Sequence, residues 1–275
     1  MKATCMVCHH HCSIEENHRG LCKARGNEGG KIVPINYGLL TGIALDPVEK
    51  KPLMRFHPGT KILSVGSFGC NLKCTFCQNH HISMASREES KASFTSPEDL
   101  VMSASDLKPR GNIGLAYTYN EPLVGYEYVR DCAILAREAG LKNVVVTNGC
   151  FMTEPMRDMI PYIDAFNIDL KGFTEGFYKK IGGDLETVKN FIKFAHGYSH
   201  VEVTTLVIPG ENDSEDEIRK LSQFIASIHR DIPLHLSRFF PCYRMTDKEP
   251  TDVSLVYRLA DIARESLSYV YEGNC

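Results

Sequence analysis

Residues 61–79, KILSVGSFGCNLKCTFCQN, begin with a run typical of a buried β-strand and continue directly into a loop with three cysteines. Cys70, Cys74 and Cys77 have the spacing C-x3-C-x2-C, and Phe76 stands directly before the last thiol. In α/β proteins, the loops that follow the strands carry most of the chemistry. A structural zinc or a fully ligated iron–sulfur cluster takes four protein ligands. The loop therefore indicates either a metal site completed by a distant cysteine or a cluster with one position open for another molecule.

Outward from this loop, short β-rich runs alternate with helical patterns along residues 60–275. Several of these runs are almost continuously apolar, as expected of parallel strands that are buried on both faces. Six such β/α units predict an α/β fold with a parallel sheet, either doubly wound or a partial barrel. The expected strands span residues 61–67, 112–118, 142–148, 163–171, 201–209 and 234–240, and the expected helices span residues 97–107, 122–139, 153–160, 184–196, 214–228 and 252–268.

The first 59 residues differ in texture, with a Cys/His-rich segment followed by a Gly-punctuated stretch that suggests one or two short strands. Because so short a segment buries little apolar surface by itself, we expect a small appendage (residues 1–59) on an α/β core domain (residues 60–275). Four cysteines of the appendage have the spacing C-x2-C-x3-C-x9-C, which indicates a bound metal, either a structural zinc or an auxiliary iron–sulfur cluster. The expected ligands are Cys5, Cys8, Cys12 and Cys22. The neighbouring His9, His10 and His11 either substitute as ligands or, as we expect, are solvated residues of the loop.

The composition of the chain limits its class of function. Of its 275 residues, 43% are apolar and 24% are charged, with a net charge of −3, which is typical of a soluble globular protein and does not favour nucleic acid as a partner. No run approaches the roughly 18 to 20 apolar residues that span a bilayer, and the N-terminus has no apolar signal core. Eleven cysteines in clusters indicate metal in a reducing compartment rather than disulfides. We therefore expect a cytoplasmic protein without a membrane partner.

The three-cysteine loop resembles the cluster-binding motif of the radical S-adenosylmethionine (SAM) enzymes, which is C-x3-C-x2-C with an aromatic residue before the last cysteine. The resemblance implies a partial (β/α)6 barrel and a [4Fe-4S] cluster held by Cys70, Cys74 and Cys77, whose open iron chelates SAM. It also implies that a reduced flavodoxin or ferredoxin supplies an electron. SAM is then cleaved into methionine and a 5'-deoxyadenosyl radical, which abstracts hydrogen from a substrate. No catalytic residue beyond the cluster ligands is expected, because the cofactor carries the radical chemistry.

Further segments are similar to those that surround SAM in this superfamily. Glu121, in YTYNEP, would accept a hydrogen bond from the SAM amino group, or else begin a helix; Tyr119 and Asn120 before it replace the usual glycine pair. Asp169 and Lys171, in FNIDLKG, point the same way on a strand and would reach SAM, or else form a buried structural pair. Thr147 and Asn148, in VTNGC, are also expected to contact SAM, unless this segment is a plain strand-to-helix turn. His235 is expected to contact SAM or else to be a core histidine, and Arg238 is expected to hold an anionic group of the substrate.

Over nearly the whole chain, the sequence is similar to the radical SAM enzymes of the AmmeMemoRadiSam system, which are relatives of the pyruvate formate-lyase-activating enzymes. The segments that carry this resemblance are the N-terminal cysteine run, LDPVEKKPL, GCNLKCTFCQN, YTYNEP, FNIDLKG, LSRFFP and YVYEGN. The resemblance implies an oxidoreductase that abstracts hydrogen from a protein glycyl site or another peptide-linked substrate. A small molecule, or a Memo-like or AMMECR-like partner protein, is the alternative substrate.

A hypothesis from another class is a metal-stabilised binding or electron-transfer protein in which both cysteine groups are structural. It requires a fourth ligand for the loop, and zinc at both sites without iron would favour it. The candidates for that ligand are Cys132, Cys150, Cys242 and Cys275.

Overall fold

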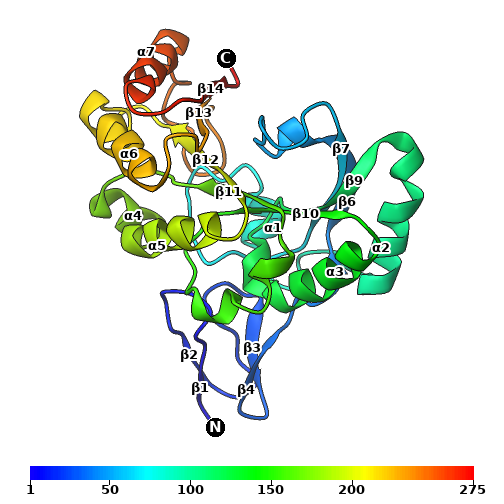
Figure 1. Cartoon of the computed structure of the whole chain (residues 1–275). Coiled ribbons are helices and arrows are strands. Elements are labelled where there is room, and N and C mark those ends of the chain that lie inside the picture. Colours follow the sequence, from blue (N-terminus) through cyan, green and yellow to red (C-terminus); the bar gives the residue numbers. More distant parts are fainter.

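An eight-stranded, curved sheet lies at the centre of the molecule (Figure 1). In this computed structural model, which describes residues 1–275, the strand order is β14-β13-β12-β11-β10-β9-β7-β6. All neighbours are parallel except β6, which is antiparallel to β7. The edge strands β6 and β14 do not pair, so the sheet is an open, partial barrel. Its strands are β6 (Gly42–Pro47), β7 (Lys61–Gly66), β9 (Asn112–Tyr117), β10 (Lys142–Thr147), β11 (Ala165–Asp169), β12 (His200–Val207), β13 (Leu234–Arg238) and β14 (Val270–Gly273).

The predicted parallel α/β fold is confirmed. All six predicted strands are present, and each end lies within two residues of the predicted end. The sheet has two further members: β14, which is too short to give a clear strand signal in the sequence, and β6, which lies within the first 59 residues. The sheet therefore extends into the stretch that the sequence assigned to the appendage.

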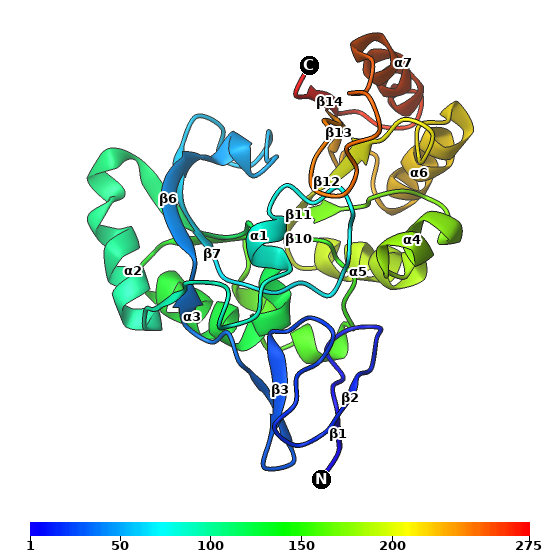
Figure 2. The same ribbon diagram turned by 180° about the vertical axis from the view of Figure 1, so that it is seen from behind.

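Helices α2 to α7 lie around the outside of the curved sheet, whereas the short helix α1 lies within its curve (Figure 2). Four of them, α2, α5, α6 and α7, begin after a Ser or Asp whose side chain accepts a hydrogen bond from a backbone N–H of the first turn. Such N-caps satisfy donors that the helix itself leaves free. None of the helices combines the length and the apolar character that crossing a bilayer requires. The helices are α1 (His80–Ser83), α2 (Pro97–Asp106), α3 (Tyr126–Glu138), α4 (Glu175–Ile181), α5 (Leu185–His196), α6 (Glu215–Ile228) and α7 (Val253–Arg264), with single 3-10 turns at Val48–Lys50, Lys108–Arg110 and Pro122–Gly125.

One predicted helix, at residues 153–160, is wrong. This segment instead forms two separate 3-10 turns, Glu154–Met156 and Ile160–Tyr162. Pro155 and Pro161 are the second residues of these turns. Proline has no N–H and disfavours helical backbone in the residue before it. Pro155 inside this segment and Pro161 directly after it therefore oppose one continuous helix.

The N-terminal hairpins (residues 1–34) lie at one end of the molecule, below the sheet in Figure 1. β1 pairs with β2, and β3 pairs with β4, both antiparallel. A third two-stranded sheet joins β5 to β8. The bounds of these strands are β1 (Ala3–Thr4), β2 (Ser13–Ile14), β3 (Arg25–Glu28), β4 (Lys31–Pro34), β5 (Leu39–Leu40) and β8 (Ser93–Phe94).

The floor segment (residues 48–60) closes the barrel at the end where the parallel strands begin. Its Val48, Leu53 and Phe56 are buried in one cluster with inward residues of four strands, namely Ile62, Ala116, Val144 and Ala165. The segment is also tied to β12, because Glu202 accepts hydrogen bonds from the backbone N–H groups of Met54 (3.0 Å) and Arg55 (2.8 Å). The opposite end of the barrel, where the strands finish, is left for the site.

Candidate functional site

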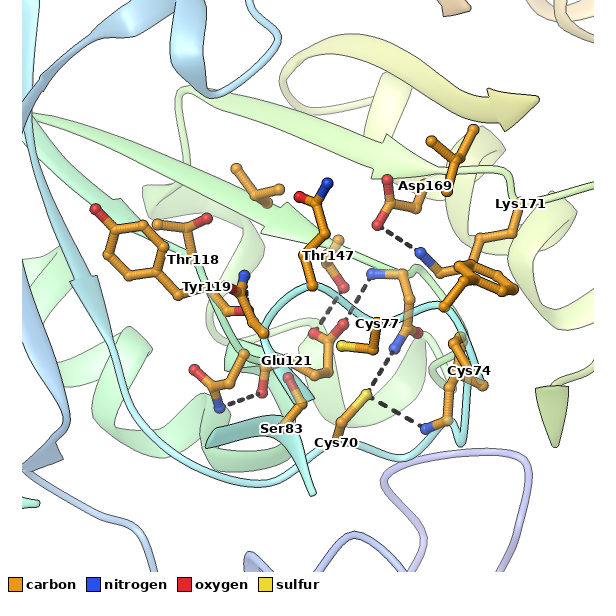
Figure 3. A pocket seen from close by; sticks show the side chains of 18 of the residues that line it. Cys70, Cys74, Cys77, Ser83, Thr118, Tyr119, Glu121, Thr147, Asp169 and Lys171 are labelled. Carbon is orange, nitrogen blue, oxygen red and sulfur yellow. Dashed lines mark hydrogen bonds and ion pairs between the residues drawn. The ribbon is translucent and has the colours of Figure 1, made fainter. Parts of the chain in front are cut away.

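A cavity of about 290 Å³ opens at the carboxyl ends of the parallel strands (Figure 3). Its walls come from the three-cysteine loop (residues 69–79) and from the ends of β9, β10, β11, β12 and β13. This is the edge at which parallel α/β folds gather functional side chains. Eight of the residues singled out in the sequence line this one cavity: Cys70, Cys74, Cys77, Glu121, Thr147, Asn148, Asp169 and Lys171.

Local hydrogen bonds fix the three-cysteine loop around the cavity. The backbone N–H of Lys73 donates to the Ile181 carbonyl at 2.9 Å, and that of Gly69 donates to the Ile82 carbonyl at 3.0 Å. The Cys70 sulfur accepts from the backbone N–H of Leu72 (3.4 Å) and from the Asn148 side-chain amide (3.7 Å). Donors aimed at sulfur favour the thiolate form, which is the form that binds metal.

Burial raises the pKa values of two loop thiols, those of Cys70 and Cys74. The pKa of Cys70 lies well above its ordinary value because of burial and the neighbouring Glu121, and burial raises that of Cys74 to about 11, against the opposing charge of Lys171. Thiols with raised pKa values lose their protons readily only when a metal ion replaces the proton on the sulfur. The donor set therefore fits a thiophilic metal group, with Lys171 close enough to offset part of its negative charge.

Glu121 is the most enclosed carboxyl group of the cavity, at 3% exposure. Its oxygens accept hydrogen bonds from the Leu123 N–H (3.0 Å), the Thr147 hydroxyl (2.8 Å) and the Asn148 N–H (2.8 Å). Burial raises its pKa to about 7, although these three donors act in the opposite direction. A carboxylate has about four acceptor positions, so one remains for a donor that enters the cavity.

Asp169 and Lys171 form an ion pair on the cavity wall, with 2.9 Å between Lys171 Nζ and Asp169 Oδ2 (Figure 3). Burial opposes the charge of Lys171, but Asp169 and the Cys74 thiol raise its pKa, and the net direction is upward. The pair thus combines the two sequence hypotheses, since it is a partly buried Asp–Lys pair that also faces the cavity.

Two expected contacts lie elsewhere, and the structure corrects their placement. His235 Nε2 is 2.7 Å from the buried carboxylate of Glu202, one layer deeper in the barrel, so the imidazole is a satisfied core histidine. Arg238 donates through Nε to the Thr251 carbonyl at 2.7 Å, and its guanidinium lies 4.8 Å from the centre of the Phe240 ring. Neither residue lines the cavity.

Asn120 is a structural residue of the site that the sequence did not single out as a contact. Its side chain accepts from the Ser67 N–H at 2.9 Å and donates to the Gly69 carbonyl at 3.1 Å, which ties the end of β9 to the three-cysteine loop. Tyr119 beside it has the left-handed φ of 71° that glycine usually adopts, and its hydroxyl donates to Asp46 at 2.8 Å. The signal in the sequence was the replacement of a glycine pair by these two residues.

None of the candidates for a fourth ligand lines the cavity. Cys132 is fully buried in α3, Cys150 contacts His9, and Cys275 is exposed. The Cys242 sulfur lies 3.8 Å from the Cys77 carbonyl oxygen. No group of three or more His, Cys, Asp or Glu side chains is arranged as a ready ligand set for one metal ion. The cavity therefore supplies three thiols and no fourth protein ligand.

The N-terminal cysteines lie together in a second, small cavity. Cys5, Cys8 and Cys22 are buried, and Cys12 is partly buried. All four line this cavity, together with Arg25 and Asn71. The structure thus gathers the two cysteine groups on either side of Asn71, the residue that follows Cys70.

Comparison with known proteins gives matches along most of the chain. The model of the Radical SAM superfamily matches residues 64–222. The protein MJ0808 of Methanocaldococcus jannaschii is 40% identical over 278 residues, which cover 99% of this chain and 81% of that protein. The pyruvate formate-lyase-activating enzyme of Clostridium pasteurianum is 25% identical over 202 residues, covering 70% of this chain and 80% of that enzyme. The 4-hydroxyphenylacetate decarboxylase activating enzyme of Clostridioides difficile is 23% identical, covering 55% of this chain and 48% of that enzyme.

Solved structures share the fold. Streptococcus suis SuiB has a TM-score of 0.61 at 15% identity, covering 77% of this chain and 48% of that chain. This chain therefore spans about half the length of SuiB. QueE from Escherichia coli has a TM-score of 0.52 at 14% identity, covering 85% of this chain and 92% of that chain.

Proposed function

Since the chain belongs to the radical SAM superfamily, we propose that it cleaves SAM reductively at the three-cysteine loop and abstracts hydrogen from a peptide-linked substrate. Membership implies an enzyme with a [4Fe-4S] cluster and SAM. When bound, these two supply one-electron cleavage of the sulfonium, which gives methionine and a 5'-deoxyadenosyl radical. The observation that carries the proposal is the convergence of three thiols, Glu121 and the Asp169–Lys171 pair on one cavity.

Different residues of the cavity would bind the cluster and SAM. Cys70, Cys74 and Cys77 would hold the cluster, and the fourth iron would stay open for SAM. Glu121 would accept a hydrogen bond from the SAM amino group, because its carboxylate already faces the cavity and retains acceptor capacity. Asp169 would take the ribose hydroxyls and Lys171 a carboxylate, while Thr147 and Asn148 would hold Glu121 in position.

Glu121→Gln tests the proposed amino-group contact. The variant keeps the size of the side chain but replaces one acceptor oxygen by an NH₂ donor. A hydrogen bond to a charged group contributes roughly 1.5–3 kcal/mol, so the Kd for SAM should rise about 10- to 100-fold. The measurement is the change in the electron paramagnetic resonance signal of the reduced cluster as SAM is added. Glu98→Gln, in the first turn of α2, is the control; an unchanged Kd in Glu121→Gln would remove Glu121 from the SAM site.

The substrate class rests on the relatives. Two matched relatives are named as activating enzymes, one of pyruvate formate-lyase and one of 4-hydroxyphenylacetate decarboxylase. By this likeness, we place a glycyl site of a partner protein first among the substrates. The alternative, from the AmmeMemoRadiSam resemblance, is radical modification of a small molecule or of a Memo-like or AMMECR-like protein.

A surface cavity supports a flavodoxin or ferredoxin as the reductant. This cavity, of about 240 Å³, is lined by Cys70 and by Lys23, Lys73 and Arg244. The three cations are exposed, and Lys73 and Arg244 form no ion pair. A positive rim attracts an acidic carrier and lets it dock beside the Cys70 side of the loop. An oxygen-sensitive cluster and eleven free cysteines suit the reducing cytoplasm.

The N-terminal part completes the proposal. We assign residues 1–59 as a metal-stapled appendage on the core domain of residues 60–275, although β6 of this appendage joins the main sheet. Its four cysteines would hold zinc or an auxiliary iron–sulfur cluster, because neither hairpin is long enough to bury a core of its own.

The proposed function is tested by product formation. Protein reconstituted without oxygen, with iron and sulfide, is incubated with SAM and either dithionite or reduced flavodoxin. We expect 5'-deoxyadenosine and methionine with both reductants, and neither product when the reductant is omitted. If no 5'-deoxyadenosine forms with dithionite, the enzymatic function is contradicted and a structural metal protein remains. If it forms with dithionite alone, the assignment of flavodoxin as the donor is contradicted.

A further inference from the structure

The small cavity between the N-terminal hairpins and the three-cysteine loop is lined by several cysteine side chains. Four cysteine side chains contribute to it, from positions 5, 8, 12 and 22. The strands β1 and β2 bring the first three together, because the Cys5 N–H donates to the Cys12 carbonyl at 2.9 Å across the hairpin. The fourth, Cys22, precedes the left-handed residue Lys23 (φ 61°), which turns the chain back into β3. Four thiols in one small cavity form a donor set suited to a thiophilic metal.

Backbone donors point at two of these sulfurs. The N–H group of His10 is directed at the Cys8 sulfur, and those of Ala24 and Arg25 are directed at the Cys22 sulfur. Donors of this kind stabilise a thiolate, which is the form that binds metal.

Arg25 gives an independent indication of a hydrogen-bond acceptor that is missing from this cavity. Its side chain is 5% exposed, and its two terminal nitrogens donate to the Glu127 carboxylate at 2.7 and 2.9 Å. The remaining donor, Nε, is buried and has no hydrogen-bond partner, although Arg25 lines the same cavity as the four thiols. A buried donor without an acceptor costs roughly 1–3 kcal/mol, so an acceptor that appears in this cavity would be stabilised.

We infer that the four N-terminal thiols bind a thiophilic metal as a tetrathiolate centre. Arg25 completes this centre by donating a hydrogen bond through Nε to one of the sulfurs. The metal-loaded centre in turn positions the three-cysteine loop. As each metal–sulfur bond forms, the thiol proton leaves to solvent, and no electron is transferred. The thiols close on the metal as it binds, since they are not spaced as a ready set for one ion. The metal is a zinc ion or the iron of a second cluster, which share this thiolate chemistry.

The backbone beside Cys22 is packed directly on the start of the three-cysteine loop. A Cβ added to Gly69 would lie 2.6 Å from the Cys22 carbonyl oxygen and 2.7 Å from the Ala24 Cβ, and Gly69 has a φ of 89°. Only glycine allows this approach at this φ. His10 Nε2 lies 2.8 Å from the Asn71 carbonyl oxygen, which joins the first cysteine turn to the same loop.

A short hydrogen-bond chain continues from this contact to the cluster ligand. Asn71, which lines the N-terminal cavity, accepts through Oδ1 from the Asn148 side-chain amide at 2.8 Å. The same amide lies 3.7 Å from the Cys70 sulfur, and Asn71 Nδ2 donates to the Cys150 carbonyl at 2.9 Å. A shift of Asn71 would therefore move a donor away from Cys70, which links metal binding at one cysteine group to the geometry of the other.

The metal part of the inference is tested on its own. Zinc and iron per chain are measured in protein isolated without oxygen, for wild type and for the double variant Cys8→Ser/Cys22→Ser. We expect the variant to lose about one zinc and no iron, or to lose the iron of one cluster and no zinc, which identifies the metal. Wild-type protein is also heated with and without a strong chelator, and a lower unfolding temperature with chelator is expected. Equal metal contents in the two proteins, or no effect of the chelator, would overturn the tetrathiolate centre.

Arg25 is tested by comparing Arg25→Gln with Glu127→Gln. Both variants break the same ion pair, but only the first removes the Nε donor. A hydrogen-bond partner of a metal ligand typically contributes a factor of roughly 10 to 100 to the affinity for the metal. We therefore expect Arg25→Gln to release its metal at a chelator concentration about 10-fold lower than Glu127→Gln does. Release at the same concentration would show that Arg25 acts only through Glu127.

The inference that the N-terminal centre positions the three-cysteine loop rests on the proposed function. Measuring SAM binding, rather than SAM cleavage, tests this inference separately from the proposed function. In Cys8→Ser/Cys22→Ser, the iron of the three-cysteine loop should remain, whereas the resonance of the reduced cluster should change and the Kd for SAM should rise at least about 10-fold. An unchanged signal and Kd would overturn the positioning role. If wild type forms no 5'-deoxyadenosine, the proposed function fails, but the metal contents and chelator titrations still decide the N-terminal centre.

Discussion

Cys74→Ala is expected to lose the iron of the three-cysteine loop and, with it, all reductive cleavage of SAM. Two remaining thiols cannot hold a cluster that needs three of them and one open iron. Cys74 is 6% exposed and lines the cavity beside Lys171, so its removal also leaves that cation without the nearby sulfur. The chain itself should stay folded, because replacing one buried sulfur by hydrogen typically costs only about 1 kcal/mol of unfolding free energy.

The matched control is Cys132→Ala. Cys132 is also a buried free thiol, at 0% exposure, but it lies in α3 and does not line the cavity. Both variants are reconstituted in parallel, and the iron content, the visible absorption of the cluster and the yield of 5'-deoxyadenosine are compared. Cys132→Ala should match wild type in all three. Wild-type yield from Cys74→Ala would contradict the assignment of the loop as the cluster site.

The strands and the three-cysteine loop were predictable because both depend on local patterns. Parallel strands that are buried on both faces give continuous apolar runs in the sequence. Functional side chains lie in the loops at the carboxyl ends of such strands, so the end of a predicted strand indicates where to look for them. The same rule placed Glu121 after β9 and the Asp169–Lys171 pair at the end of β11, where the structure has them. Helix 153–160 was wrong because Pro155 lies inside this segment and Pro161 directly follows it, so the chain forms two 3-10 turns instead.

Placement along a strand was predictable only to within one layer of the barrel. Ser237, two residues after His235 on the same face of β13, lines the cavity, so His235 lies one layer deeper and meets Glu202 instead. Arg238 points to the other face, because successive side chains alternate. The contacts of Arg25 and Asn71 could not be predicted at all, since they join segments that are far apart in the sequence.

Glu202→Gln is expected to cause the largest loss of stability. The Glu202 side chain is fully buried, and its two oxygens accept from four groups: the N–H groups of Met54 and Arg55, and the imidazoles of His200 and His235. The NH₂ of glutamine cannot accept, so at least one backbone N–H loses its partner and the buried charge is removed. Breaking such a network typically costs about 3–5 kcal/mol of unfolding free energy. Chemical denaturation of the reduced chain at pH 7 measures this difference.

The pH dependence identifies the carboxylate as the cause. Burial alone would raise the pKa of Glu202, but hydrogen bonds from His200, His235 and the Arg55 N–H lower it from 4.5 to about 2. A lowered pKa contributes stability above the unfolded value of 4.5 that is lost as the pH falls toward about 2. The difference between wild type and Glu202→Gln should therefore shrink across this window, whereas the exposed Glu249→Gln should match wild type within about 0.5 kcal/mol. A difference that stays constant from pH 7 to pH 3 would mean that shape at the barrel floor, rather than the charge of Glu202, determines the stability.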